Sequence, residues 1–274
     1  MQLSRTFSSY TPVRLNVLSS GGGVQSNAII CLMFTGALPR ADLVVMSDTE
    51  RESSAALDYQ REYMQPICDE MGIPYHIVKK SDYTDVDLYQ PSNGAVLAGY
   101  FSELNGRKFD GTCYGKQPSY CSTRWKREVV ERFLNDKFGT DELTRRGGGD
   151  MWMGISIDEI RRVKITTGKW RRVYPLCEML LSRRDAIQIV ENCGLPTPPR
   201  SACWMCPNRH DSEWLWMRNN CPEDFRRACE HEREIQIEHP HLWLTKYGVP
   251  LETAPFDQNS PQLDFFCNSG MCHN

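Results

Sequence analysis

The chain has 274 residues, a formal net charge of −3, 40% hydrophobic residues and 24% charged residues. These values suit a globular protein of one domain with an appendage, and they exclude a highly charged disordered chain. No apolar run is long enough to span a membrane, and the N-terminus lacks the apolar core of a signal peptide. We therefore expect a cytoplasmic protein that makes no contact with a membrane.

A glycine-rich loop is the most informative stretch of the sequence. The mostly apolar run Arg14 to Leu18 predicts a strand, and residues 27–35 predict a helix. Small residues between them let backbone N–H groups surround an anion, and the helix directs the positive end of its dipole to the same point. The alternative is a flexible glycine turn. The predicted phosphate ligands are Ser19, Ser20, Gly21, Gly22, Gly23, Gln25 and Ser26.

The segments that follow predict an α/β fold. Residues 41–50 form an apolar run that ends in acids, which predicts a buried strand with Asp48 and Glu50 at its carboxyl end. Ligands of open α/β sheets bind at such ends. Residues 53–71 have helical spacing, and residues 73–78 predict a third strand. This βαβαβ order predicts a doubly wound parallel sheet.

The order of these motifs resembles that of the adenine-nucleotide α-hydrolase superfamily, also called PP-loop ATP pyrophosphatases, which have a HUP-like fold. Within it, the chain is most similar to the PAPS reductase-like branch. Residues 21–26 match the superfamily loop Ser-Gly-Gly-x-Asp-Ser, with Gly21 for the first serine and Gln25 for the aspartate. Several PAPS reductases carry glutamine there, which argues against a magnesium ligand at this position.

Three further elements carry the resemblance, which extends from about residue 14 to about residue 220. Residues 48–50 resemble the branch's Asp-Thr-Gly/Glu element, and residues 121–126 resemble its Cys-x-x-x-x-Lys element. Residues 174–176 resemble its Pro-Leu turn. Gly154 stands where the branch keeps a Gly-x-Arg or Gly-x-Ser element.

The resemblance implies that ATP, with Mg²⁺, is split into AMP and pyrophosphate. Arg124 and Lys126 are then the predicted catalytic cations that offset charge on the phosphates. Arg161 and Arg162 are predicted to face the triphosphate or its magnesium, with a solvated helix end as the alternative.

Twelve cysteines in a reducing compartment indicate metal binding or catalysis more than disulfides. The turn Cys203-Trp-Met-Cys206 brings two thiolates to one metal. Cys121 is the predicted third ligand, because it precedes a helix beside two basic residues. Cys272 is the preferred fourth ligand, with Cys267 or an open position as alternatives. We expect an iron–sulfur cluster of the 4Fe–4S type, with zinc as the alternative.

The residues from Arg161 to Arg184 include eight Lys or Arg and one acid. Such a basic face on an acidic chain fits nucleic acid, with a solvated face as the alternative. We divide the chain into a nucleotide-binding α/β domain, residues 1–200, and a helical cysteine-bearing extension, residues 201–274. The extension turns irregular after Pro240 and is expected to pack back on the core.

These expectations favour an ATP pyrophosphatase-type sulfurtransferase that adenylates a nucleic acid acceptor. DNA backbone phosphorothioation is favoured over tRNA thiolation, and a cysteine desulfurase would supply the sulfur. The alternative is a PAPS or APS (sulfonucleotide) reductase, in which Cys272 would attack the sulfate sulfur. A second alternative is a degenerate nucleotide-binding subunit. A homodimer is left open.

Overall fold

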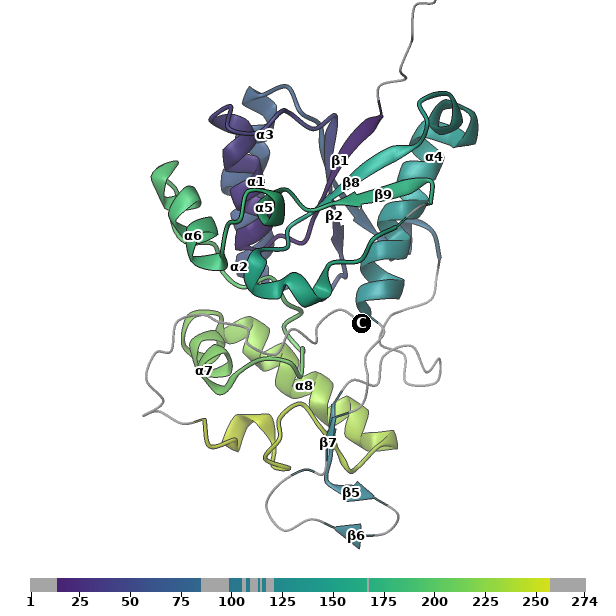
Figure 1. Cartoon of the computed structure of the whole chain (residues 1–274). Helices are drawn as coiled ribbons and strands as arrows, with labels where there is room; N and C mark the ends of the chain where they lie inside the picture. Colours follow the sequence, from purple (N-terminus) through teal and green to yellow (C-terminus); the bar gives the residue numbers. More distant parts are fainter. Residues whose placement is uncertain are drawn as a thin grey trace, which may run out of the picture.

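The computed structural model describes residues 14–84, 99–104, 107–108, 113, 115–116, 121–166 and 168–256. Its centre is a five-stranded sheet in the order β3-β2-β1-β8-β9, in which every neighbouring pair is parallel (Figure 1). The strands are β1 (Leu15–Ser20), β2 (Leu43–Asp48), β3 (Tyr75–Lys79), β8 (Gly149–Met153) and β9 (Trp170–Val173). Winding proceeds outward from β1 in both directions, which confirms the predicted doubly wound α/β class.

Helices cover both faces of the sheet (Figure 1). One face carries α1 (Val24–Phe34), α2 (Ser54–Tyr59), α3 (Gln65–Glu70), α5 (Pro175–Glu178) and α6 (Arg183–Asn192), and the other carries α4 (Glu128–Arg145). Strand alternation separates the two cores, because successive side chains point to opposite faces. Leu18 and Val44 pack with α1 and α6, whereas Val17 and Val45 pack with α4. The strands are buried on both faces, which explains their nearly continuous apolar sequences.

Two predicted helices contain π-helical turns. The helix expected over 53–71 is interrupted by a π segment, Gln60–Met64, between α2 and α3. Pro66 therefore lies in the first turn of α3, where its missing N–H costs little. A second π segment, Ser122–Arg127, precedes α4, which kinks at Gly139 with φ 66°. Short 3₁₀ turns lie at Lys80–Asp82, Ile157–Arg162 and Leu251–Thr253.

The C-terminal part lies beneath the sheet in Figure 1. Its helices α7 (Asp211–Asn220) and α8 (Pro222–Glu238) share a hydrophobic cluster of their own, which includes Trp214, Met217 and Phe225. The last eighteen residues, with Cys267 and Cys272, lie outside the described residues. The division into two domains at residue 200 stays a prediction.

A small three-stranded sheet joins the two parts. Its central strand β4 (Tyr100–Phe101) pairs with β7 (Gly115–Lys116) and with β10 (Leu242–Trp243), and β5 (Glu103–Leu104) pairs separately with β6 (Arg107–Lys108). The Gly- and polar-rich sequence of residues 102–120 predicts a loop over the nucleotide pocket. Of its described strands, β7 pairs with β4, and β5 and β6 pair with each other. Among the described helices, none combines the length and the apolar character needed to cross a membrane.

Gly154 allows the end of β8 to approach α1 closely. A Cβ at this position would lie 2.6 Å from the Oγ of Ser26 and 2.8 Å from its backbone N. Because that nitrogen belongs to α1, a side chain at 154 has to displace the helix. We predict that Gly154→Ala lowers the free energy of unfolding by about 1–3 kcal/mol, measured by urea denaturation.

Gly168→Ala is the control, because a Cβ there would meet nothing within 4 Å. This variant should unfold within about 0.5 kcal/mol of the wild type. Equal stability of the wild type and Gly154→Ala would show that the contact between β8 and α1 tolerates a methyl group.

Candidate functional site

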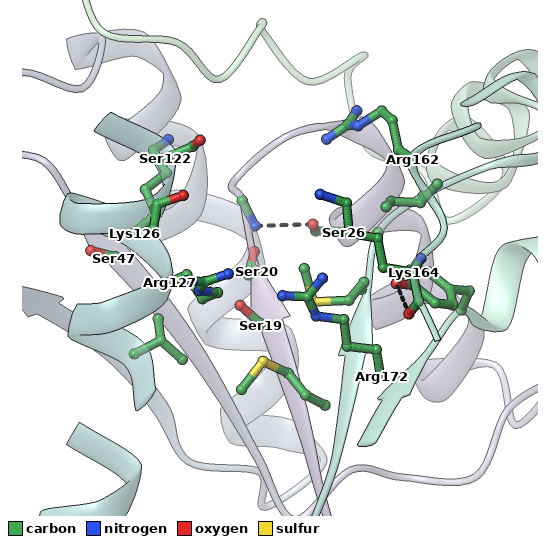
Figure 2. Close-up of a pocket in the computed structure, with 18 residues that line it drawn as sticks. Ser19, Ser20, Ser26, Ser47, Ser122, Lys126, Arg127, Arg162, Lys164 and Arg172 are labelled. Atoms are coloured by element: carbon green, nitrogen blue, oxygen red, sulfur yellow. Dashed lines mark hydrogen bonds between the residues drawn. The ribbon is translucent and has the colours of Figure 1, made fainter. Parts of the chain in front are cut away.

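A cavity of about 180 Å³ opens at the carboxyl ends of β1 and β8 (Figure 2). The winding direction of the sheet reverses between these two strands, because β1 pairs with β2 on one side and with β8 on the other. Ligands of open α/β sheets bind at such a switch point. The fold therefore places a ligand site where the glycine loop follows β1.

Five basic side chains line this cavity. They are Lys126, Arg127, Arg162, Lys164 and Arg172, and Figure 2 shows them around the end of β1. No Asp or Glu is among the lining residues of the described chain. The concentration of positive charge contrasts with the net charge of −3 of the whole chain. A polyanion is the ligand that this lining fits.

The glycine loop contributes Ser19, Ser20, Gly21 and Ser26 to the lining. The Gly21 N–H donates to the Oγ of Ser26 at 3.1 Å, and the Gly22 N–H donates to the Oγ of Ser20 at 3.1 Å. These serine hydroxyls hold the loop in shape and occupy the amides. An anion would have to take their place to accept from either N–H.

Gly22 and Gly23 were predicted ligands, but neither lines the cavity. Gly22 has φ 73°, which favours glycine, and a Cβ there would lie 2.8 Å from the Cε of Met46. Its role is to make the turn. Gly23 directly precedes α1, and no side chain caps that helix. The first amides of α1 therefore have no capping side chain, which favours an anion at this end.

Gln25 connects helices instead of lining the cavity. Its amide nitrogen donates to Glu159 Oε2 at 2.8 Å, and its oxygen accepts from Arg183 Nη1 at 3.2 Å. An amide satisfies both partners because it donates and accepts. An aspartate at this position would place a second carboxylate beside Glu159.

Four other predicted residues also lie outside the lining. Asp48 is buried and accepts the Glu50 N–H at 2.7 Å, and burial raises the pKa of its carboxyl. Glu50 has φ 61° and accepts from Ser81 Oγ at 2.9 Å. Arg124 and Arg161 are exposed, whereas their chain neighbours Arg127 and Arg162 line the cavity.

Lys126 lines the cavity and forms an ion pair with Glu52. Its Nζ lies 2.9 Å from Glu52 Oε2, and the Glu52 side chain is 0% exposed. Burial alone would lower the pKa of Lys126. The Glu52 carboxylate and the thiols of Cys203 and Cys121 outweigh burial and raise the pKa above its ordinary value. Lys126 is therefore charged at neutral pH, with much of its charge offset by Glu52.

Glu52 is also connected to the glycine loop through the hydroxyl of Ser201. Ser201 Oγ lies 2.9 Å from Glu52 Oε1 and within hydrogen-bond distance of the Gly21 carbonyl oxygen. Its single proton can be donated to one of the two. The sequence did not single out Glu52, because nothing in the local spacing links it to a lysine 74 positions later.

The cysteine turn packs against the segment after β2. Glu52 and Cys203 form an antiparallel bridge, and the Cys206 N–H donates to the Cys203 carbonyl at 3.0 Å. Thr49 Oγ1 lies 3.1 Å from Cys203 Sγ. Burial and the Glu52 carboxylate raise the pKa of the Cys203 thiol to about 12, against the opposite effect of Lys126.

The three predicted metal ligands Cys121, Cys203 and Cys206 share this neighbourhood. The thiols of Cys121 and Cys203 both raise the pKa of Lys126, and Cys203 and Cys206 belong to one turn. Nowhere in the described chain do three Cys, His, Asp or Glu side chains converge closely enough to hold a metal ion. The thiols suit a soft metal in type, but the described donors do not form a closed site. The fourth predicted ligand, Cys272, lies outside the described residues.

Several residues that line the cavity were not predicted from the sequence. Lys164 and Arg172 belong to the basic run that was assigned to nucleic acid. Strand alternation divides that run, because Arg171 bonds to Asp150 while Arg172 lines the cavity. The period of two along β9 was the available signal. The remaining lining residues not predicted include Ser47, Ser122, Thr123, Arg127 and Tyr174.

No protein-family model matches the chain, and no curated protein matches it. Two solved structures are similar. The phosphoadenylyl-sulfate (PAPS) reductase of Candida auris, a phosphate complex, is 10% identical with a TM-score of 0.44, over 72% of this chain and 84% of that one. The U34-tRNA thiolase NcsA of Methanococcus maripaludis, with its 4Fe–4S cluster, is 15% identical with a TM-score of 0.41, over 82% and 74%.

These are similarities of fold. At these scores neither similarity decides the activity.

We predict that the cavity binds inorganic pyrophosphate and that Arg172→Ala lowers the affinity by roughly tenfold or more, because one charge-assisted contact is lost. Arg171→Ala is the matched control from the same strand. Its side chain pairs with Asp150, outside the cavity. Isothermal titration calorimetry measures both variants. Equal losses in the two would mean that overall charge, not the cavity, governs binding.

Proposed function

We propose that this chain is an enzyme that binds ATP in the switch-point cavity and cleaves it between the α- and β-phosphates. The observation that carries the proposal is the lining of five basic side chains and no acid beside the uncapped end of α1. A triphosphate supplies the negative charge that this lining lacks. Pyrophosphate is then the leaving group, and the same cations stabilise it as the bond breaks.

The residues divide into two groups around the phosphates. The first amides of α1 offer backbone donors, and Lys164 and Arg172 offer charge that no ion pair within the described residues offsets. Arg162 and Arg127 also line the cavity, but they pair with Glu159 and Glu131. Lys126 adds a positioned donor whose charge Glu52 already offsets. Mg²⁺ prefers oxygen ligands and commonly binds through substrate phosphates. The lining offers it hydroxyls such as Ser19, Ser20 and Ser26, but no carboxylate.

We further propose that the activated group is a nucleic acid acceptor, with a DNA backbone phosphate favoured over a tRNA base. An acceptor oxygen attacks the α-phosphorus and pyrophosphate leaves. The outer sulfur of a persulfide from a cysteine desulfurase then attacks the activated atom and displaces AMP, and a thiol reductant cleaves the remaining S–S bond to leave one sulfur on the acceptor. Exposed Arg161 and Arg184 lie outside the cavity on the segments beside it, which supports a polyanionic partner. The ten described cysteines are thiols, which fits a cytoplasmic location.

An iron–sulfur cluster on Cys121, Cys203 and Cys206, with Cys272 as fourth ligand, is part of the same proposal, and zinc is the alternative. Its support is the position of the cysteine turn, whose Cys203 lies beside Thr49 and acts on Lys126 at the cavity. A cluster bound there would supply sulfur or redox chemistry next to the nucleotide.

A sulfonucleotide reductase is the second candidate, and the absence of carboxylates from the described lining favours it. A sulfonucleotide needs cations for its phosphates and sulfate but no carboxylate-held magnesium. Its attacking cysteine would be Cys272, outside the described residues. A nucleotide-binding subunit without catalysis is the remaining alternative.

We predict that the protein converts ATP to AMP and pyrophosphate. The reaction is measured by separating the labelled products. Lys126→Ala should lower kcat by roughly ten- to thousandfold, because it removes one electrostatic donor. Arg132→Ala is the control, since its guanidinium packs over the ring of Tyr83, away from the cavity. Turnover of PAPS with a thiol donor, and none of ATP, would replace the first candidate by the second. Turnover of neither, with binding intact, would leave the non-catalytic subunit.

We predict that protein purified without oxygen contains iron and sulfide and absorbs broadly in the visible range. Cys203→Ser and Cys206→Ser should lose this absorbance, because an alcohol is a poor iron ligand at neutral pH. Cys221→Ser is the control from the same part of the chain. Bound zinc without colour, lost in the same two variants, would establish the zinc alternative. Metal content unaffected by either variant would exclude this turn as the site.

A further inference from the structure

A second cavity, of about 130 Å³, lies in the C-terminal part of the chain. Arg209, His210 and Asp211 line it where α7 begins, Tyr100 lines it from β4, and Lys246 lines it from the segment after β10. None of these residues lines the first cavity. The two sites are therefore separate.

Arg209 is the central feature of this second cavity. Arg209 is 9% exposed. Its Nε donates to the Cys203 carbonyl oxygen, and its Nη2 donates to the carbonyl oxygens of Ala202 and Cys203. Within the described chain it forms no ion pair, and Nη1 donates to no acceptor. Burial lowers the pKa of Arg209 from its ordinary value, yet a guanidinium remains charged in proteins. A buried cation without a carboxylate requires a counter-ion.

The surrounding groups favour an anion as that counter-ion. Among the first amides of α7, the Glu213 N–H is accepted by the capping residue His210, whereas the N–H groups of Asp211 and Ser212 have no acceptor within the helix, and the dipole of this ten-residue helix is positive at this end. Lys116 adds positive charge nearby, with its Nζ 6.0 Å from the centre of the Tyr100 ring. Among the described lining residues the single acid is Asp211, which already pairs with Lys246 at 3.4 Å and accepts from Tyr247 Oη at 2.5 Å. Glu213 and the thiols of Cys206 and Cys203 offset part of the Arg209 charge, but Glu213 is itself paired with Arg200, so Arg209 has no carboxylate of its own.

We propose that this second cavity binds a phosphate-type oxyanion, with the guanidinium of Arg209 and the first turn of α7 as its donors. The volume suits one such group, and guanidinium with helix amides is a common combination for phosphate. The group is either free inorganic phosphate or one phosphodiester of a nucleic acid strand. The proposal does not depend on nucleotide binding in the first cavity.

The test begins with the double variant Lys164→Ala/Arg172→Ala, which weakens anion binding in the first cavity. Inorganic phosphate is titrated into this protein by calorimetry. Adding Arg209→Gln should lower the remaining affinity by roughly ten- to hundredfold, because a charged donor is lost. Arg218→Gln is the matched control on α7, since its guanidinium packs over the Phe256 ring outside the cavity.

Asp211→Asn is a second, independent variant for the case in which Arg209→Gln does not fold. It removes the like charge and releases Lys246, while the amide oxygen can still accept from Tyr247. Phosphate affinity should rise by roughly three- to tenfold. Unchanged affinity in Asp211→Asn, together with unchanged affinity or no folded protein for Arg209→Gln, would overturn the proposal.

A single-stranded DNA hexamer, titrated into the same variants, distinguishes the two sources. Affinity for the hexamer that falls with Arg209→Gln or rises with Asp211→Asn identifies a phosphodiester. If these variants change the affinity for inorganic phosphate but not the affinity for the hexamer, the ligand is a free oxyanion. Because the first cavity is disabled throughout, the result is independent of ATP cleavage.

Discussion

The ion pair between Glu52 and Lys126 is the contact on which the rest of the site depends. Glu52 follows β2, Lys126 begins the helix that covers the opposite face, and the carboxylate has no exposed surface. Through Ser201 the same carboxylate reaches the glycine loop, and through its backbone it pairs with Cys203. Removing one partner of a buried pair costs about 3–5 kcal/mol. The loop, the helix and the cysteine turn are therefore positioned together.

This pair also divides the charge of the cavity. Lys126, Arg162 and Arg127 each pair with a carboxylate, so the charge of an incoming polyanion falls mainly on Lys164 and Arg172. Arg172 on β9 and Lys164 before it form no ion pair within the described residues. They can turn toward a ligand without breaking an ion pair within the described chain. The fixed lysine and the adaptable cations thus lie on opposite sides of the glycine loop, as Figure 2 shows.

The sequence was sufficient for the framework. Apolar runs buried on both faces, and the small residues after Leu18, predicted the parallel sheet and the loop at its switch point, and the structure confirms that fold class. The details of the lining were less accessible. The contact between Glu52 and Lys126 joins distant positions, and no local pattern encodes it. Gln25 was predicted as a phosphate ligand from its place in the glycine loop. It bonds to Glu159 and Arg183, and no local pattern encodes contacts with segments so far along the chain.

The two π-helical turns have a consequence for comparing this chain with others. Gln60 begins the first and donates to the Gly22 carbonyl at 3.1 Å, and Lys126 lies in the second. A π turn holds one more residue than an α turn, and one residue in a helix corresponds to a rotation of about 100°. An alignment that treats either segment as regular helix therefore shifts all residues on one side by a position. In such an alignment the buried Trp125 occupies the position that belongs to Lys126.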